Sequence, residues 1–143
     1  MRQIARGLGL LLFSMVAVAT GVEAEEELSA ALRQVVENNL AAYNSKDVAG
    51  TMRSIHTKSP DYPAMQLALP GQFSDLDIRT ELANFQYIGH DDEFAVARVK
   101  LKTVGQPGKP FAGNVIDTIA VFYPEEGEWK YWSNLVLGVE LVQ

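Results

Sequence analysis

The 143-residue sequence contains no cysteine. Disulfide bonds, thiolate nucleophiles, metal sites with cysteine ligands and a lipid anchor on cysteine are therefore excluded. Its two histidines, His56 and His90, are far apart and form no metal-binding pair, so we expect no metal site. The sequence also has no Gly-x-Ser-x-Gly nucleophile motif and no phosphate-binding glycine loop. We expect no cofactor.

Basic residues are few, with 12 Lys and Arg against 18 Asp and Glu. Removal of residues 1–24, for which we argue below, takes away Arg2, Arg6 and Glu23 and leaves 10 basic and 17 acidic residues, a net charge of −7. That sign opposes binding to nucleic acid and to anionic membrane surfaces. We expect neither as a partner of the processed chain.

The one long apolar run lies near the N-terminus. Arg2 and Arg6 precede the uncharged run Leu8–Ala19, and Val22-Glu23-Ala24 places small residues where a signal peptidase cuts. The run is too short for a membrane span, which needs about 20 apolar residues. We therefore interpret residues 1–24 as a cleavable signal peptide and residues 25–143 as one domain. A domain exported without disulfides suits the periplasm.

Helical periodicity comes first in the predicted domain. One long amphipathic helix is expected from Glu26 to Lys46, because apolar residues recur there at three- and four-residue spacing. Asp47 is a candidate N-cap for a second, short helix that must end before Ser59-Pro60. Ala64–Leu69 is expected to form a helical turn that Pro70-Gly71 interrupts.

The second half of the chain alternates with the period of a strand. Turn-rich links separate four predicted strands, and such links favour an antiparallel meander. The four segments are Arg79–Gly89, Phe94–Val104, Val115–Tyr123 and Trp129–Val142. Helices followed by strands make an α+β fold, in which the long helix packs on the concave side of a curved sheet. The cone so formed has a wide mouth suited to a small molecule.

Two motifs resemble those of a known superfamily. Leu40–Val48 resembles the joint between the first two helices of the nuclear transport factor 2-like (NTF2-like, or SnoaL-like) superfamily, and Glu126–Tyr131 resembles its last hairpin. The segments Ser74–Asp77 and Phe111–Asn114 resemble those of an uncharacterised subgroup of this superfamily. With its signal peptide, this chain would be an exported member of that subgroup. The resemblance implies a cone-shaped fold. It leaves the function open among isomerases, cyclases, dehydratases and binding domains, so the site must decide.

A comparison with the ketosteroid isomerases of this superfamily indicates candidate residues. Asn39 holds the place of a tyrosine that donates a hydrogen bond in the isomerase pocket, and Tyr43 lies one helical turn further on. Asp61 lies near the place of the isomerase base. The resemblance thus implies an acid–base role for Asp61 and a donor role for Asn39 or Tyr43.

Polar residues on apolar faces are the other candidates. Asn39 lies within the apolar stripe of the long helix, where an unpaired amide would cost about 1–3 kcal/mol, so it bonds either to strand backbone or to a ligand. Asp117 shares a strand face with Ile119 and Val121. It is either an acid or base in the pocket or a surface partner of Arg98.

His56 lies near the end of the second helix, where it either caps the helix or acts as a base paired with Asp61. We expect Asn39, Tyr43 and Asp117 to line one cavity. Tyr62 and Trp132 are aromatic candidates for its wall.

Three functions compete at this level. The first is an exported domain that binds a small apolar molecule or assists another protein, and the second is an enzyme that uses Asp117 with His56 or Asp61. The third is a protein-interaction module. A homodimer through the sheet is expected from one apolar strand face, comprising Tyr131, Leu135, Leu137, Val139 and Leu141.

The signal peptide leads to a direct prediction. The mature protein should begin at Glu25 and be recovered from the soluble fraction outside the cytoplasm, as checked by intact mass and N-terminal sequencing. An intact Met1 in the membrane fraction would contradict the prediction.

Overall fold

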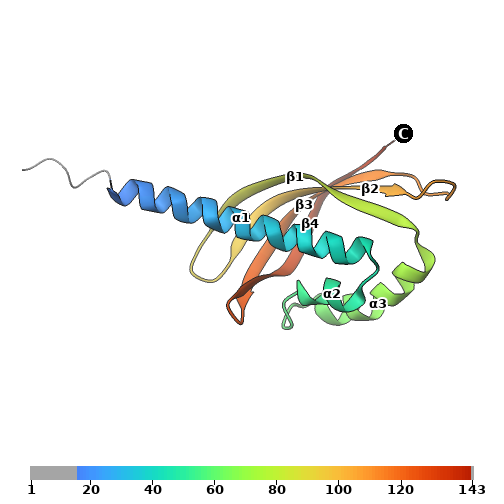
Figure 1. Ribbon diagram of the computed structural model, residues 1–143, viewed down its shortest axis with the longest axis horizontal. Helices are drawn as coiled ribbons and strands as arrows, with labels where there is room; N and C mark the ends of the chain where they lie inside the picture. The colour runs from blue at the N-terminus through green and yellow to red at the C-terminus, as the bar shows by residue number, and fades with distance from the viewer. Residues whose placement is uncertain (1–15, 143) are drawn as a thin grey trace, which may run out of the picture.

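Three helices precede four strands in the computed structural model, which describes residues 16–142 (Figure 1). Residues 1–15, with most of the predicted signal peptide, lie outside the described part of the chain. No helix among the described residues combines the length and apolar character that a membrane span requires.

Helix α1, Val16–Asn44, crosses one side of the sheet (Figure 1). The predicted stripe is confirmed, because Leu32 and Val36 are buried and Leu28, Val35 and Tyr43 pack against the core. The predicted start at Glu26 is wrong by ten residues. Alanines and glutamates, which favour helix, continue the helix backwards, and no proline interrupts residues 16–25. Residues 20–27 are exposed, and among the residues from 20 onward Leu28 is the first of α1 that packs against the core.

Helix α2, Val48–Arg53, begins at the predicted cap: the Asp47 carboxylate accepts a hydrogen bond of 2.8 Å from the Gly50 amide. Helix α3, Tyr62–Asp75, is longer than predicted and contains Pro70. Proline was expected to break it. Instead Met65, Leu69 and Phe73, spaced four residues apart, pack on the core, while Pro70 itself is exposed. The packing of this stripe outweighs the backbone hydrogen bond that a proline removes.

The strands follow the predicted order and nearly the predicted bounds. They are β1 Ile78–His90, β2 Ala95–Gly105, β3 Asn114–Glu125 and β4 Glu128–Leu141. Neighbouring strands pair antiparallel in the order β1-β2-β3-β4, and the sheet curves around the helices (Figure 1). The α+β prediction with an antiparallel meander is confirmed.

Burial alternates along the central strands, which shows that the helices cover one face of the sheet. In β2, Ala95, Ala97 and Val99 are buried, and in β3 Ala120 and Phe122 are buried. The residues between them are less buried and form the uncovered face.

Two register shifts in the β3–β4 pairing change the alternation in β4. Trp132 is an extra residue between the pairs Tyr131–Phe122 and Ser133–Val121, and Leu137 is extra between Val136–Thr118 and Gly138–Asp117. Residues opposite each other in a ladder share a face. Tyr131, opposite the buried Phe122, therefore lies on the covered face, whereas Leu135 lies on the other. The single apolar face predicted for β4 does not exist, because each bulge reverses the alternation.

The β3–β4 turn holds an unfavourable residue. Glu126 and Gly127 both have positive φ, 53° and 82°, as in a type I′ hairpin turn. Asparagine fits the first of these positions far better than glutamate.

Glu126→Asn should therefore stabilise the domain by about 0.5 kcal/mol, which raises the Tm by about 2 °C in thermal unfolding followed by circular dichroism. Glu126→Gln is the control, because it removes the same charge without a preference for positive φ. Equal Tm values for the two variants would contradict the turn-based explanation.

Candidate functional site

A cavity of about 270 Å³ lies between the helical layer and the covered face of the sheet. Its walls are largely apolar and come from α1, the segment that joins α2 to α3, the first turn of α3, and strands β2 to β4. The lining residues are Asn39, Ile55, Ser59, Asp61, Met65, Val99, Leu101, Ile116, Thr118, Tyr131, Trp132, Ser133, Asn134 and Val136. Apolar walls with a few polar groups are typical of small-molecule pockets.

The segment after α2 closes one side of this cavity by pairing with β4. The Tyr131 amide donates to the Ser54 carbonyl and the His56 amide donates to the Tyr131 carbonyl, both at 2.8 Å. Ile55 thereby forms a parallel bridge with Tyr131. The Ser59 hydroxyl adds a bond of 2.6 Å to the Trp132 carbonyl. These contacts bring Ser59 and Asp61 to the sheet.

Asn39 lines the cavity, but its amide is used inside the protein. Its Nδ2 donates to the Ser54 hydroxyl at 2.6 Å and to the Thr51 carbonyl at 3.3 Å. Both acceptors lie at the C-terminal end of α2, not on a strand. Asn39 therefore joins α1 to α2, as a structural bond, while it contributes one edge of the cavity wall.

Three other lining residues keep free polar groups. The Tyr131 hydroxyl, the Asp61 carboxylate and the Asn134 amide make no side-chain hydrogen bond within residues 16–142. Tyr131 is only 8% exposed, and burial raises the pKa of its phenol. A buried phenol normally has a partner. The cavity thus has a phenol in its interior, on Tyr131, and a carboxylate and an amide on the exposed residues Asp61 and Asn134. Asp61 is the one charged residue in its lining.

Asp117 lies on the opposite face of the sheet, contrary to the expectation that it shares a cavity with Asn39 and Tyr43. Its carboxylate accepts two hydrogen bonds from Arg98, at 2.9 and 2.6 Å, and Lys100 Nζ lies 3.6 Å away. The hydrogen bonds from Arg98 hold the pKa of Asp117 below its usual value. The alternation of β3 explains the placement, since Ile116 and Thr118 take the cavity side. Asp117 is a surface partner of Arg98.

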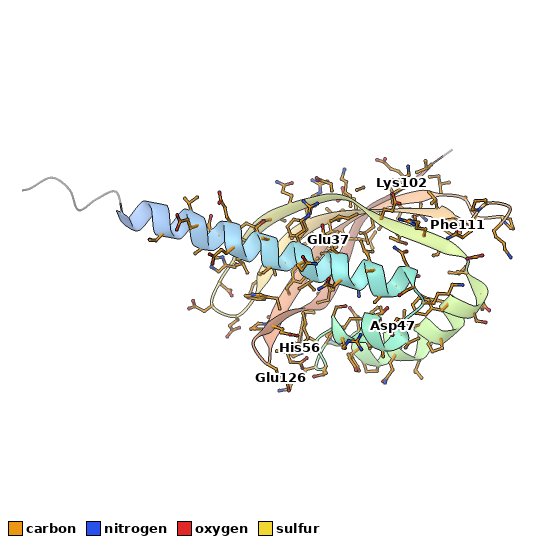
Figure 2. The ribbon with its side chains drawn as sticks, viewed as in Figure 1. Glu37, Asp47, His56, Lys102, Phe111 and Glu126 are labelled. Carbon is orange, nitrogen blue, oxygen red and sulfur yellow. The ribbon has the colours of Figure 1, made fainter. Side chains whose placement is uncertain are left out.

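His56 is buried beside the β3–β4 hairpin rather than in the cavity (Figure 2). Its Nδ1 accepts the Lys58 amide at 3.0 Å, and its ring meets Trp132 edge-on at 5.1 Å. The ion-pair partner of Nδ1 is the Glu125 carboxylate, at 3.6 Å, so of the two alternatives for His56 the pairing with Asp61 is not present. Hydrogen bonds from Thr57 and then Lys130 hold the pKa of Glu125 below its usual value.

Tyr43 and Tyr62 pack against the core and do not line the cavity. Tyr43 meets Phe73 edge-on at 5.1 Å, and burial raises the pKa of its phenol. Tyr62 begins α3. Of the residues predicted for the site, the structure brings together Asn39, Asp61 and Trp132.

The sequence did not reveal Tyr131, Ser133 and Asn134 as site residues. Regular alternation groups Tyr131 with Leu135 on the apolar face expected to form a dimer, and Ser133 and Asn134 follow a bulge that reverses their orientation. Alternation alone gives no signal for such a bulge. Among the described residues, no group of three His, Asp or Glu side chains is placed to hold a metal ion.

A larger depression, about 650 Å³, lies between α1, α2 and the β3–β4 turn. Its lining includes the exposed Arg53 and the partly buried Lys130. Both cations already have carboxylate neighbours, Asp47 at 3.6 Å and Glu125 at 3.2 Å. The smaller cavity is the better site, because its phenol and carboxylate are unpaired.

Comparison with known families gives a match over residues 34–142, to the family described as the C-terminal domain of the anti-sigma-I factor RsgI9. The chain belongs to the RsgI9 C-terminal domain family. No curated protein sequence matches it significantly.

Several solved structures share the fold of this RsgI9 C-terminal domain chain. A candidate scytalone dehydratase from Novosphingobium aromaticivorans aligns with a TM-score of 0.69 and 8% identity, over 85% of this chain and 92% of that one. An NTF2-like protein from Pseudomonas putida gives 0.62 and 13%, over 79% and 84%. A ketosteroid isomerase-like protein from Erwinia carotovora atroseptica gives 0.58 and 10%, over 80% and 95%. At these identities the likeness concerns the fold.

The two bonds of Asn39 lead to a stability prediction. Asn39→Leu should lower stability by about 1 kcal/mol, and the Tm by about 4 °C, because α1 loses its polar link to the end of α2. Asn38→Leu is the matched control: Asn38 is exposed and bonds to Gln34 on the same helix. If Asn39→Leu leaves the Tm unchanged or raises it in thermal unfolding, the two bonds add nothing to stability.

Proposed function

We propose that the protein is an exported domain that binds a small, mainly apolar molecule in the cavity between α1 and the sheet. The observation that carries this proposal is the cavity with apolar walls and three unused polar groups, on Tyr131, Asp61 and Asn134. Such groups would orient a ligand whose body is held by the walls. The fold is compatible with this role, since NTF2-like relatives include dehydratase-like and isomerase-like proteins.

The polar groups indicate the chemistry of the ligand. The Asp61 carboxylate accepts hydrogen bonds and favours a positive charge, whereas the Tyr131 hydroxyl can donate to an oxygen or nitrogen acceptor. With no cation in the lining, a carboxylate or phosphate ligand would have no partner of opposite charge. The expected ligand is therefore neutral or cationic, with a compact apolar body.

Binding without catalysis is favoured over the enzymatic alternative. General acid–base catalysis needs titratable groups within reach of the same substrate. Asp117 lies on the other face of the sheet and His56 outside the cavity lining, so Asp61 has no carboxylate or histidine partner there. The remaining titratable group is the Tyr131 phenol, and burial raises its pKa, which suits it to donate a hydrogen bond and not to give up its proton. The family name describes one domain of an anti-sigma factor, which also supports a binding role within a larger assembly or pathway.

Export to the periplasm remains part of the proposal. The charged start, short apolar run and small residues before Glu25 support it. Residues 20–24 are exposed, so among the residues whose burial the structure describes, cleavage after Ala24 would remove no core contact.

Three fluorinated probes of one shape test the site by ¹⁹F NMR: 4-fluorobenzylamine, 4-fluorobenzyl alcohol and 4-fluorobenzoate. The amine should bind tightest and the acid weakest, because of Asp61. Asp61→Asn should reduce the preference for the amine about fivefold, since exposed charge pairs contribute up to about 1 kcal/mol.

Filling the cavity supplies the decisive variant. Ile116→Phe should weaken binding of the alcohol at least tenfold, whereas Ile119→Phe, on the opposite face of the same strand, should leave it unchanged. Circular dichroism checks that both variants fold. Binding that survives Ile116→Phe, or that Ile119→Phe weakens equally, would rule out this cavity as the binding site.

A further inference from the structure

The two edges of the sheet differ in how they are protected. Edge strand β1 has two bulges, carries charged residues such as Arg79 and Glu81, and is tied to α1 where Asn44 bonds both the amide and the carbonyl of Thr80. Along β4, the segment Ser54–His56 covers the edge only at Tyr131. Within the described part of the chain, no strand pairs with the outer side of the remaining stretch, Ser133–Leu141.

This open stretch is apolar on both faces. The exposed fractions are 64% for Leu135, 55% for Val136, 50% for Leu137, 56% for Val139 and 75% for Leu141. Natural edge strands usually carry lysine, proline or other features that prevent pairing. Ser133–Leu141 contains neither residue, and its one charge is Glu140. Monomeric proteins rarely expose a contiguous apolar patch larger than a few hundred Å².

We propose that a second copy of this chain pairs antiparallel along Ser133–Leu141, so that two sheets join into one continuous sheet. At roughly 3.3 Å per residue the open stretch offers a ladder of about 30 Å. A two-fold axis makes such an interface self-complementary. A second copy fits better than a foreign strand, because Ser133–Leu141 can pair with the same stretch of a second copy in a defined register.

The two bulges of β4 select that register. Opposite residues must lie on the same face of the joined sheet. Two pairings meet this condition on both sides of the bulge at Leu137, one centred between Val136 and Leu137 and one centred between Leu137 and Gly138. The first would set the extra residue Trp132 opposite Leu141, so the pairing that stays clear of the Trp132 bulge is the second. It places Val136 opposite Val139 of the second copy, and Leu137 opposite the Gly138 of that copy. A Cβ at Gly138 would meet nothing within 4 Å, so there is room for the leucine.

The same register avoids a clash of like charges. It places Glu140 opposite Leu135 of the second copy, on the uncovered face, and not opposite another Glu140. On the covered face, Asn134 and Val136 line the cavity. The second copy would therefore wall the open side of the cavity beside β4, and the two sites would adjoin across the two-fold axis. This last point rests on the proposed function, whereas the pairing itself does not.

Two substitutions at one position test the register in the full-length chain purified from its exporting host. Leu135→Lys should keep the dimer, because each lysine faces Glu140 of the second copy. Leu135→Glu should raise the dimer dissociation constant at least tenfold, because each introduced glutamate faces Glu140 of the second copy. Leu67→Glu, at an 84% exposed leucine of α3, is the control and should remain dimeric.

Sedimentation velocity over a range of concentrations measures the dissociation constants, and circular dichroism verifies folding. A wild-type protein that stays monomeric overturns the proposal. The same holds if the monomer pairs with a strand of another protein instead of a second copy. Equal loss of the dimer in Leu135→Lys and Leu135→Glu overturns the register, and a dimer retained in both overturns the interface. Because sedimentation requires no ligand, failure here is distinct from failure of the ¹⁹F binding assay.

Discussion

The parallel bridge between Ile55 and Tyr131 is the constraint on which the site depends. It fastens the segment between α2 and α3 to the edge of the sheet, and Ser59 strengthens it by bonding to the carbonyl of Trp132. Hydrogen bonds from the Thr57 amide to the Glu125 carboxylate also tie this segment to the sheet, at β3. With the bridge, one wall of the cavity has a fixed position and Asp61 lies at the rim. The same bridge covers β4 only up to the bulge at Trp132 and leaves the rest of that edge open.

The side chains of strand β4 lie in several different surroundings because the strand has two bulges. Its first residues follow the tight hairpin turn, its middle lines the cavity, and its last residues extend beyond the helical layer. A regular strand could present one set of side chains to each face throughout its length. Each extra residue reverses that assignment, so one strand contributes Tyr131 and Val136 to the cavity and Leu135 to the opposite face.

The fold was predictable from the sequence to a greater extent than the site. Strand bounds came within about two residues because alternation and turn residues are local signals. Helix α3 was underestimated because Pro70 was read as a breaker, although Met65, Leu69 and Phe73 pack well enough to carry the helix through it. The same local reasoning placed the cap at Asp47 correctly.

The positions of the candidate site residues depend on two features that the sequence does not show. One is the face of the sheet that each strand residue takes, and the other is contact between residues far apart in the sequence. Asp117 was ambiguous because its face could be either side of the sheet, and only the position of the helices resolves this. Asn39 was correctly expected to need a partner, but that partner lies on α2, fifteen residues away, and not on a strand. Tyr131 was misplaced because a bulge leaves no mark in the alternation of apolar residues.

The order of elements along the chain also bears on how the domain folds. The meander pairs each strand with the next, so most sheet contacts are local and can form as the chain emerges. The contact between Ser59 and Trp132 spans 73 residues, and the loop it closes contains α3 and most of the sheet. Loop closure makes such contacts slow relative to hairpins. We therefore expect the sheet to assemble hairpin by hairpin, and the binding cavity to be the last part of the domain to take shape.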